Sequence, residues 1–155
     1  LPVRPPCMHI AILTFQGFNA LDSLVALGVL NRVKKPGWRV TLCCPEPEVT
    51  SMNGVTIRAQ SSLEDAASAG AVIVGSGVRT REVVESHELL SRIKLDPRNQ
   101  LIGAQCSGTL ILAKLGLVNG IEAAKSALHY VAPVGEKDAY VSNALKNLEP
   151  HLSDA

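Results

Sequence analysis

Short, mostly apolar runs separated by longer amphipathic stretches recur along the first 120 residues. The runs cover residues 9–15, 39–44, 71–74 and 101–105. Runs of this length and composition are typical of strands that are buried on both faces of a parallel sheet. Between them, apolar residues return every three or four positions, which predicts helices. Strands that alternate with helices predict an α/β fold, with a mostly parallel sheet covered on both faces.

Capping and turn signals place the ends of these elements. Asn19 is expected to cap a first helix that has Asp22 at its third position and continues to the Lys34–Gly37 stop signal. Asn53-Gly54 predicts a two-residue hairpin turn between residues 49–52 and 55–59, at an edge of the sheet. Further helices are predicted over residues 62–70, 80–93 and 109–115, and over 121–148 with breaks at Pro133 and Gly135.

The length of 155 residues fits one domain, which we place at residues 8–155. Residues 1–7 contain three prolines and no apolar run of the kind that a secretory signal needs. We interpret them as a non-native extension before Met8 or as a disordered start.

Charge and composition exclude several classes of function. The net charge is +1 and aromatic residues make up 3% of the chain, so neither a basic patch nor a base-stacking surface for nucleic acid is predicted. No apolar run approaches the roughly 18 residues of a membrane span. The four cysteines come without a signal peptide and two are adjacent, so a disulfide framework is not expected and a reducing cytoplasm fits better.

The candidate nucleophile is Cys106. It lies between small residues, in Ala104-Gln105-Cys106-Ser107-Gly108, where the last predicted strand turns into a helix. This arrangement is typical of a nucleophile elbow, and the amides at the start of the helix would favour the thiolate. The alternative is a small buried hydrophobe, which is our interpretation of Cys43 and Cys44 inside a strand.

Two further segments follow strands at the same edge of the sheet. Gly75-Ser76-Gly77 could donate backbone amides to an oxyanion, although a plain tight turn is an equal alternative. Thr80 stands where a dinucleotide loop has its third glycine, so no nucleotide cofactor is predicted. Asp22 could be a capping residue or could face Cys106 as an acid–base partner. The four histidines lack ligand spacing, so no metal site is predicted.

Together, Asp22, Gly75-Ser76-Gly77 and the elbow that leads into Leu112-Ala-Lys-Leu-Gly-Leu117 resemble the DJ-1/PfpI (ThiJ) family of the class I glutamine amidotransferase-like superfamily. The resemblance implies a flavodoxin-like three-layer sandwich, a homodimer, and Cys106 as nucleophile or redox centre beside Asp22. Ser107 stands where peptidase-like members carry histidine, which disfavours a peptidase. This pattern is similar to the isonitrile hydratase branch and to sensor domains of AraC-type regulators.

The sequence departs from the family after Gly120, where members continue with further strands, often with a Thr-Thr-His motif. Here Ile121 begins what looks like the carboxyl-terminal part, so several dozen residues of the family pattern are missing. Either a stretch is left out of this sequence or the deletion is real. The missing part would line the pocket, so the substrate is not predicted.

Two functions follow from these residues. In the first, the Cys106 thiolate attacks a small electrophilic molecule in a hydratase, hydrolase or lyase reaction. Asp22 moves the proton, and amides of Ser107 and of the Gly75–Gly77 loop hold the developing charge. In the second, the domain is not catalytic and senses oxidation through Cys106, or binds a ligand.

Overall fold

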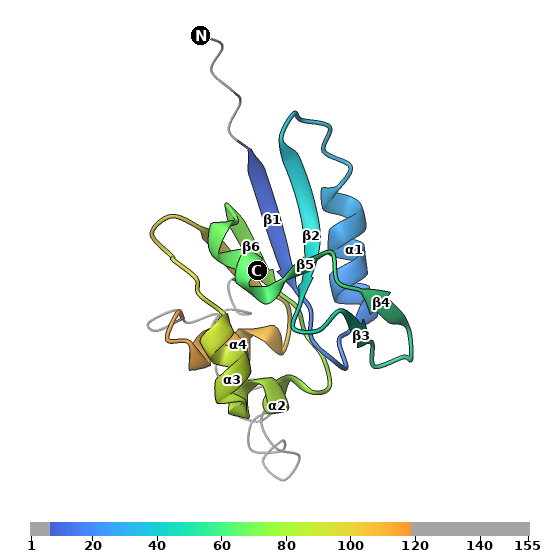
Figure 1. Ribbon diagram of the computed structural model, residues 1–155, viewed down its shortest axis with the longest axis vertical. Coiled ribbons are helices and arrows are strands. Elements are labelled where there is room, and N and C mark those ends of the chain that lie inside the picture. The colour runs from blue at the N-terminus through green and yellow to red at the C-terminus, as the bar shows by residue number, and fades with distance from the viewer. Residues whose placement is uncertain (1–6, 119–155) are drawn as a thin grey trace, which may run out of the picture.

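The computed structural model describes residues 7–118, which form one five-stranded sheet with helices on both faces (Figure 1). The strand order is β5-β2-β1-β6-β7, and every neighbouring pair is parallel. The strands of this sheet are β1 (Met8–Leu13), β2 (Trp38–Cys44), β5 (Ser61–Ser62), β6 (Ala71–Val74) and β7 (Leu101–Ala104). The predicted α/β fold with a parallel sheet is therefore confirmed.

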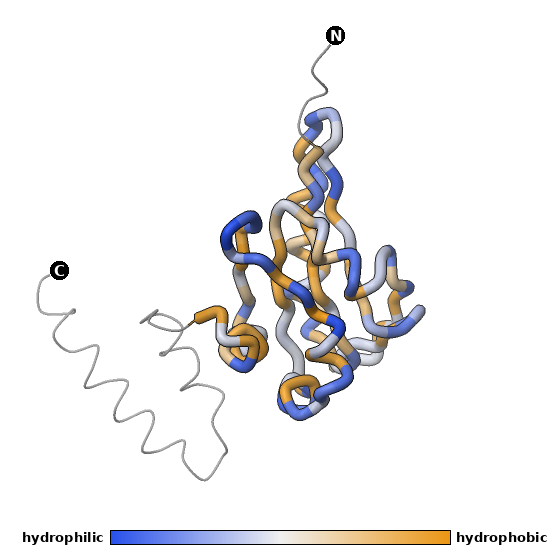
Figure 2. The backbone as a smooth tube through the Cα atoms, turned by 60° about the vertical axis from the view of Figure 1, so that its left-hand side comes forward, coloured by the Kyte–Doolittle hydropathy of each residue, from blue (hydrophilic) through white to orange (hydrophobic). Residues whose placement is uncertain are grey.

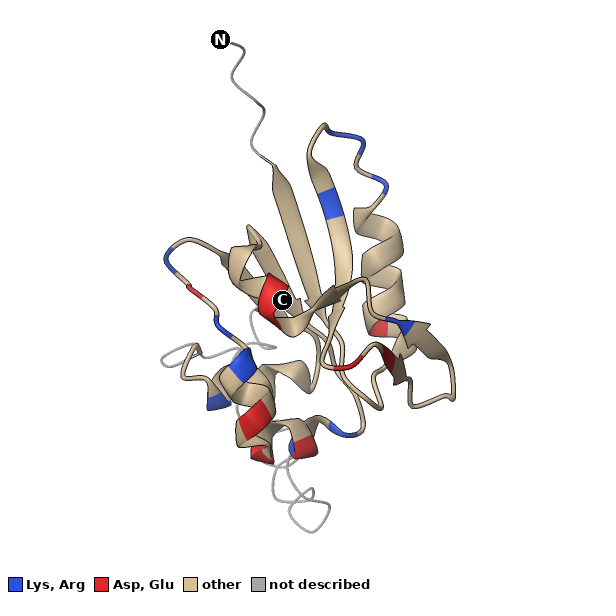
Figure 3. Cartoon of the chain, in the orientation of Figure 1, with Lys and Arg blue, Asp and Glu red and all other residues tan. Residues whose placement is uncertain are grey.

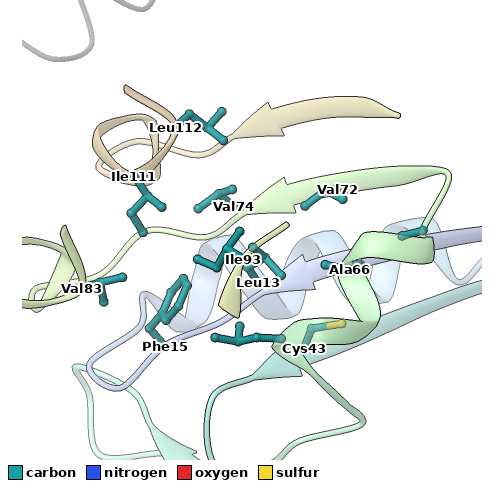
Figure 4. Packing of buried hydrophobic residues seen from close by; sticks show 13 residues of the cluster. Leu13, Phe15, Cys43, Ala66, Val72, Val74, Val83, Ile93, Ile111 and Leu112 are labelled. Carbon is teal, nitrogen blue, oxygen red and sulfur yellow. The ribbon is translucent and has the colours of Figure 1, made fainter. Parts of the chain in front are cut away.

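The two faces of the sheet bury two separate apolar clusters. Helix α1 (Ala20–Leu30) covers one face through Leu24 and Leu27, which pack on a cluster that includes Ile12 and Leu42. The other face carries the 3-10 helix η1 (Leu63–Ser68), α2 (Thr80–Glu85), α3 (His87–Arg92) and α4 (Gly108–Lys114). Figure 4 shows this second cluster, in which Leu13 and Val74 from the strands lie among Val83, Ile93 and Ile111. The layers are those of the predicted three-layer sandwich.

Helix boundaries follow local hydrogen bonding more closely than apolar spacing. The Asn19 side chain caps α1 as predicted, by accepting from the Leu21 N–H at 3.1 Å, but the helix ends at Leu30 rather than near Lys34. The single helix predicted over residues 80–93 is wrong. Ser86 has extended backbone, and its hydroxyl accepts from the Leu89 N–H at 3.2 Å, so it ends α2 and caps α3.

The predicted hairpin forms, but its turn differs from the expected two-residue turn. Strands β3 (Glu48–Thr50) and β4 (Thr56–Arg58) pair in an antiparallel two-stranded sheet of their own. The Ser51 N–H donates to the Val55 carbonyl, and Gly54 has a φ of 83°, so three residues and not two make the turn. The hairpin is bound to the loop after β1, where Met52 N–H donates to the Phe18 carbonyl at 2.9 Å.

Polar and apolar residues separate as the layers require. Apolar segments run through the middle of the fold and hydrophilic segments lie at its periphery (Figure 2). Charged residues lie mainly on helices and loops, and β1 and β6 carry none (Figure 3). No helix among residues 7–118 is long and apolar enough to cross a membrane. The helices predicted within residues 121–148, and the sequence departure after Gly120, lie outside the described residues.

Candidate functional site around Cys106

The predicted site residues follow three neighbouring strands, β1, β6 and β7, at their carboxyl ends. Parallel strands bring the residues after them to the same edge of the sheet, which is where ligands bind in folds of this kind. Asp22 lies in the first turn of α1, Gly75–Gly77 follows β6, and Cys106 follows β7. The register pairs Leu13 with Val74 and Val74 with Ala104, so the three strands end level with one another.

Cys106 has a strained backbone and an exposed side chain. Its φ of 44° lies in the left-handed region, and it is the only non-glycine residue among those described with a positive φ. This conformation costs about 1–2 kcal/mol for a residue with a Cβ. The side chain is exposed while the next residues, Ser107 and Gly108, are buried. The chain therefore has the shape of a nucleophile elbow, with the thiol presented outward.

Gly108 allows this turn to lie close to β6. A Cβ added at Gly108 would lie against the Val74 carbonyl oxygen and 2.7 Å from the Gly75 carbonyl oxygen. Both are backbone atoms, which cannot rotate away. The first residue of α4 must therefore be glycine if the elbow is to lie against the end of β6.

A hydrogen bond joins Asp22 to Ser76 at the carboxyl edge of the sheet. The Ser76 hydroxyl, which is buried, donates a short hydrogen bond to Oδ2 of Asp22. This bond orients the carboxylate toward the loop after β6, residues 75–77. Asp22 is therefore not only a residue of the first turn of α1, because its side chain also contacts this loop. The Asp22 main chain is also held, because its carbonyl oxygen accepts from the Gln105 side chain at 3.0 Å.

Ser107, Thr80 and Gly77 form a closed ring of hydrogen bonds. The Gly77 N–H donates to the Ser107 hydroxyl oxygen at 3.2 Å, and the Thr80 hydroxyl donates to the Gly77 carbonyl at 2.8 Å. The two hydroxyl oxygens are 2.8 Å apart, so either hydroxyl can donate to the other, and the Ser107 hydroxyl also donates to the Gly77 carbonyl at 3.3 Å. The Ser107 side chain is thereby committed to the β6 loop and is not a base for the Cys106 thiol.

The residues on both sides of Cys106 thus anchor the segments that carry Asp22 and Ser76. Gln105 binds the Asp22 main chain, and Ser107 binds Gly77, which follows Ser76. Neither Gln105 nor Thr80 was assigned a role from the sequence. Gln105 lies inside the elbow motif, which is a signal that it could belong to the site, whereas Thr80 is only the first residue of a helix. The sequence does not indicate which way either side chain points.

The amides expected to hold negative charge are fewer than predicted. Gly75 N–H donates to the Leu13 carbonyl at 2.9 Å, and Gly77 N–H is used in the ring with Ser107. Among residues 7–118, no group accepts from the N–H of Ser76 or of Ser107. These two amides remain as donors for a developing oxyanion.

The other cysteines and the histidines do not join this site. Cys43 and Cys44 are buried in β2, and burial raises the pKa of the Cys44 thiol to about 12. Within the described part of the chain, no three His, Cys, Asp or Glu side chains are grouped so that they could hold a metal ion. The thiol available for chemistry at this edge of the sheet is therefore that of Cys106.

Comparison with known proteins gives a family and a fold. The family model described as the DJ-1/PfpI family matches residues 8–136. A search of curated proteins found no match. Among solved structures, the VC2308 protein has a TM-score of 0.61 at 22% identity, with 74% of this chain and 61% of that chain covered.

Two DJ-1 structures are similar as well. Oxidized Toxoplasma gondii DJ-1 has a TM-score of 0.60 at 18% identity, with 73% of this chain and 64% of that chain covered. Drosophila melanogaster DJ-1beta has a TM-score of 0.58 at 24% identity, with 72% and 62% covered. The chain thus spans less than two thirds of the length of these three proteins, and at these identities they show the fold. From the family match over residues 8–136, the chain belongs to the DJ-1/PfpI family.

Proposed function

We propose that the chain is a cysteine-dependent enzyme that adds water to a small electrophilic molecule, with Cys106 as nucleophile and Asp22 as proton carrier. The observation that carries this proposal is the exposed Cys106 at a φ of 44°, whose two neighbours are bonded to the segments that carry Asp22 and Ser76. Holding a thiol and a carboxylate in fixed segments is what nucleophilic and acid–base catalysis require.

The family branch that the sequence resembles is named for the hydration of isonitriles. With an isonitrile as substrate, the proposed steps are as follows. The Cys106 sulfur forms a bond to the terminal carbon, and that carbon takes a proton from Asp22. Water then adds its oxygen to the same carbon and one of its protons goes to the nitrogen. The carbon–sulfur bond breaks, the other water proton returns to Asp22, and the thiolate and an N-substituted formamide are released, so that one water molecule is consumed in total.

The local hydrogen bonds support Asp22, rather than Ser107, as the proton carrier. The Ser107 hydroxyl is committed to Gly77 and Thr80. The Asp22 carboxylate accepts from Ser76 through one oxygen, Oδ2, which leaves Oδ1 for a proton. The free amides of Ser76 and Ser107 would stabilise negative charge that develops near the thiol.

The second candidate is a redox sensor, which is favoured by the exposure of Cys106 and by the N–H of the next residue, Ser107, which has no acceptor among residues 7–118. An exposed thiol at the start of a helix is oxidised by peroxide first to sulfenic and then to sulfinic acid. Because no substrate is needed, this function requires Cys106 but not proton transfer by Asp22.

One experiment separates the two candidates. Purified chain is given a panel of aliphatic and aromatic isonitriles and, separately, peroxide, and products are followed by mass spectrometry. The variants are Cys106→Ser, Asp22→Asn and the matched control Cys7→Ser, which removes another exposed thiol. Formamide production lost in the first two variants and kept in the control supports the enzyme. Sulfinic acid at Cys106 without turnover of any isonitrile supports the sensor.

We further propose that the protein is a homodimer, as the family resemblance implies, and that it is located in a reducing compartment. The four unpaired cysteines are compatible with such a compartment. Sedimentation of the reduced chain at micromolar concentration tests the dimer, and a single species with the mass of one chain would contradict it.

A further inference from the structure

A pocket of about 300 Å³ lies beyond the carboxyl ends of β1 and β2. Its apolar lining comes from four segments: Phe15 follows β1, Pro45 follows β2, and Val83 and Leu89 belong to α2 and α3. Phe15 and Val83 are members of the buried cluster on this face of the sheet, and Figure 4 shows them at the same end of it. None of the described residues that form the site around Cys106 lines this pocket, so it is a separate site.

The pocket lining carries three ionised side chains, those of Glu46, Arg79 and Glu82. Arg79 Nε donates to the Glu82 carboxylate at 2.8 Å, so these two charges neutralise each other. The carboxylate of Glu46 is exposed and takes part in no hydrogen bond or ion pair within residues 7–118. The lining therefore has one negative charge without a partner, and its net charge is −1.

The neutral polar side chains of the pocket already have donors for their oxygen atoms. The Gln16 side-chain oxygen accepts from the Thr50 N–H at 3.0 Å, and the Ser86 hydroxyl oxygen accepts from the Leu89 N–H at 3.2 Å. Glu46 is thus the side chain in the lining that is left to accept hydrogen bonds from a ligand.

Arg92 lies close to Glu46 but does not neutralise it. Arg92 Nε donates to the Glu64 carboxylate at 2.6 Å, and its Nη2 donates to the Pro45 carbonyl at 3.0 Å. The hydrogen bond with Glu64 is the main cause that raises the pKa of the Arg92 guanidinium, and the charge of Glu46 adds to it through space. Each arginine at this pocket is therefore paired with a carboxylate other than that of Glu46.

We infer that this pocket binds a small amine, in which a positively charged ammonium group is joined to an apolar body. The body contacts Phe15, Val83 and Leu89, and the ammonium group donates to Glu46. At roughly 30 Å³ for each water-sized group, the pocket has room for about ten such groups. The negative charge of the lining disfavours an anionic ligand of the same size.

Benzylamine is the probe for this site, with benzyl alcohol and benzoate as the neutral and anionic molecules of similar size. The full chain is titrated with each at pH 7, and binding is followed by calorimetry and by amide NMR. We expect saturable binding of benzylamine with a Kd of about 1 mM or below, and shifts at residues 15–16, 45–46 and 82–89. Because exposed ion pairs are weak, benzyl alcohol should bind about three- to tenfold more weakly, and benzoate more weakly still.

Glu46→Gln removes the charge that would hold the ammonium group. Its matched control is Glu85→Gln, since Glu85 is an exposed carboxylate of α2 that does not line the pocket. Glu46→Gln should bind benzylamine about as weakly as the unaltered chain binds benzyl alcohol, whereas the control should bind it as before.

Four results would overturn the inference. They are no saturable binding of benzylamine, equal affinity for benzylamine and benzyl alcohol, undiminished binding in Glu46→Gln, and amide shifts confined to the residues around Cys106. None of these measurements depends on activity at Cys106, so failure here is distinct from failure of the proposed function.

Discussion

The hydroxyl of Ser76 and the carboxylate of Asp22, 54 residues apart in the sequence, share a short hydrogen bond at the carboxyl edge of the sheet. The bond gives the proposed proton carrier one fixed orientation. Ser76→Ala should therefore lower the proposed turnover roughly 10- to 100-fold, because an unheld carboxylate samples unproductive directions.

Turnover per folded molecule across a pH series is the measurement for Ser76→Ala, with Ser91→Ala as the control, since Ser91 lies exposed in α3. If the hydroxyl acts only in packing, stability will fall while turnover per folded molecule stays unchanged. A lower turnover per folded molecule at every pH is expected, because the bond from Ser76 orients the Asp22 carboxylate.

The ring formed by Gly77, Thr80 and Ser107 should behave as one unit in stability measurements. Thr80→Val and Ser107→Ala are each expected to cost about 1–2 kcal/mol, since each leaves buried polar groups without partners. The double variant should cost less than the sum by about 1 kcal/mol. Urea unfolding of the four proteins gives this coupling, and strict additivity would show that the ring is not cooperative.

Gly108→Ala should be severely destabilising. The added methyl group would meet two backbone oxygens, those of Val74 and Gly75, so the elbow must move away from β6. We expect a loss of about 3 kcal/mol or more in the free energy of unfolding and loss of the selective reactivity of Cys106.

The matched control is Gly28→Ala in α1, where an added Cβ meets nothing within 4 Å. It should raise the free energy of unfolding by about 0.5–1 kcal/mol, because alanine is the better helix former. Thermal unfolding compares the melting temperatures of the two variants. Similar melting temperatures would mean that the elbow is not held against β6.

His9 predicts how stability depends on pH. Its side chain is buried, Nε2 is 2.7 Å from the Thr41 hydroxyl, and Nδ1 has no partner among the described residues. Burial, and then the charge of Arg39, lower the pKa of the imidazole below its ordinary value of 6.5. The unfolded chain therefore binds the proton more readily, so this contribution is present above about pH 6.5 and is lost as the pH falls below it.

The test compares free energies of unfolding at pH 7.5 and pH 5.5 for the natural chain and for His9→Gln, with exposed His87→Gln as control. His9→Gln should reduce the loss of stability on acidification, by at most about 1.4 kcal/mol per pH unit. The control should keep the full loss. Identical pH dependence in all three proteins would contradict the assignment.

The four cysteines should differ in alkylation rate. Burial raises the pKa of the Cys43 thiol and that of Cys44, the latter to about 12, whereas Cys7 and Cys106 are exposed. Brief iodoacetamide treatment at pH 7 should label Cys106 at least 100-fold faster than Cys43 or Cys44. Peptide mapping reads the rates, and the proposed activated thiol would be ruled out by a Cys106 rate no higher than that of Cys7.

The sequence predicts the architecture well because the inner strands β1 and β6 pack in apolar clusters on both faces of the sheet, and such strands must be apolar throughout. It also places Cys106 at a turn between small residues, which the structure confirms as an elbow with a positive φ. The predicted helix boundaries are wrong where a hydrogen bond from one polar side chain ends or begins a helix. Ser86 divides a helix that apolar spacing had predicted as continuous, through a hydrogen bond that spacing does not encode.

The hydrogen bonds within the site could not be predicted either, because they depend on which distant residue each polar side chain reaches. Gln105 and Ser107 were visible in the motif, but their partners Asp22 and Gly77 are 83 and 30 residues away. The same is true of the amides: the N–H groups of Gly75 and Gly77 have acceptors in Leu13 and Ser107, whereas those of Ser76 and Ser107 have none among residues 7–118.

The long separations within the site also affect how the protein folds. Bonds that span 30, 54 and 83 residues form only after β1, β6 and β7 have paired, so the site is completed late, when the loop entropy of the whole sheet has been overcome. A nascent or partly folded chain would hold Cys106 as an ordinary flexible thiol. Reactivity specific to Cys106 therefore reports that the β1–β6–β7 part of the sheet has assembled.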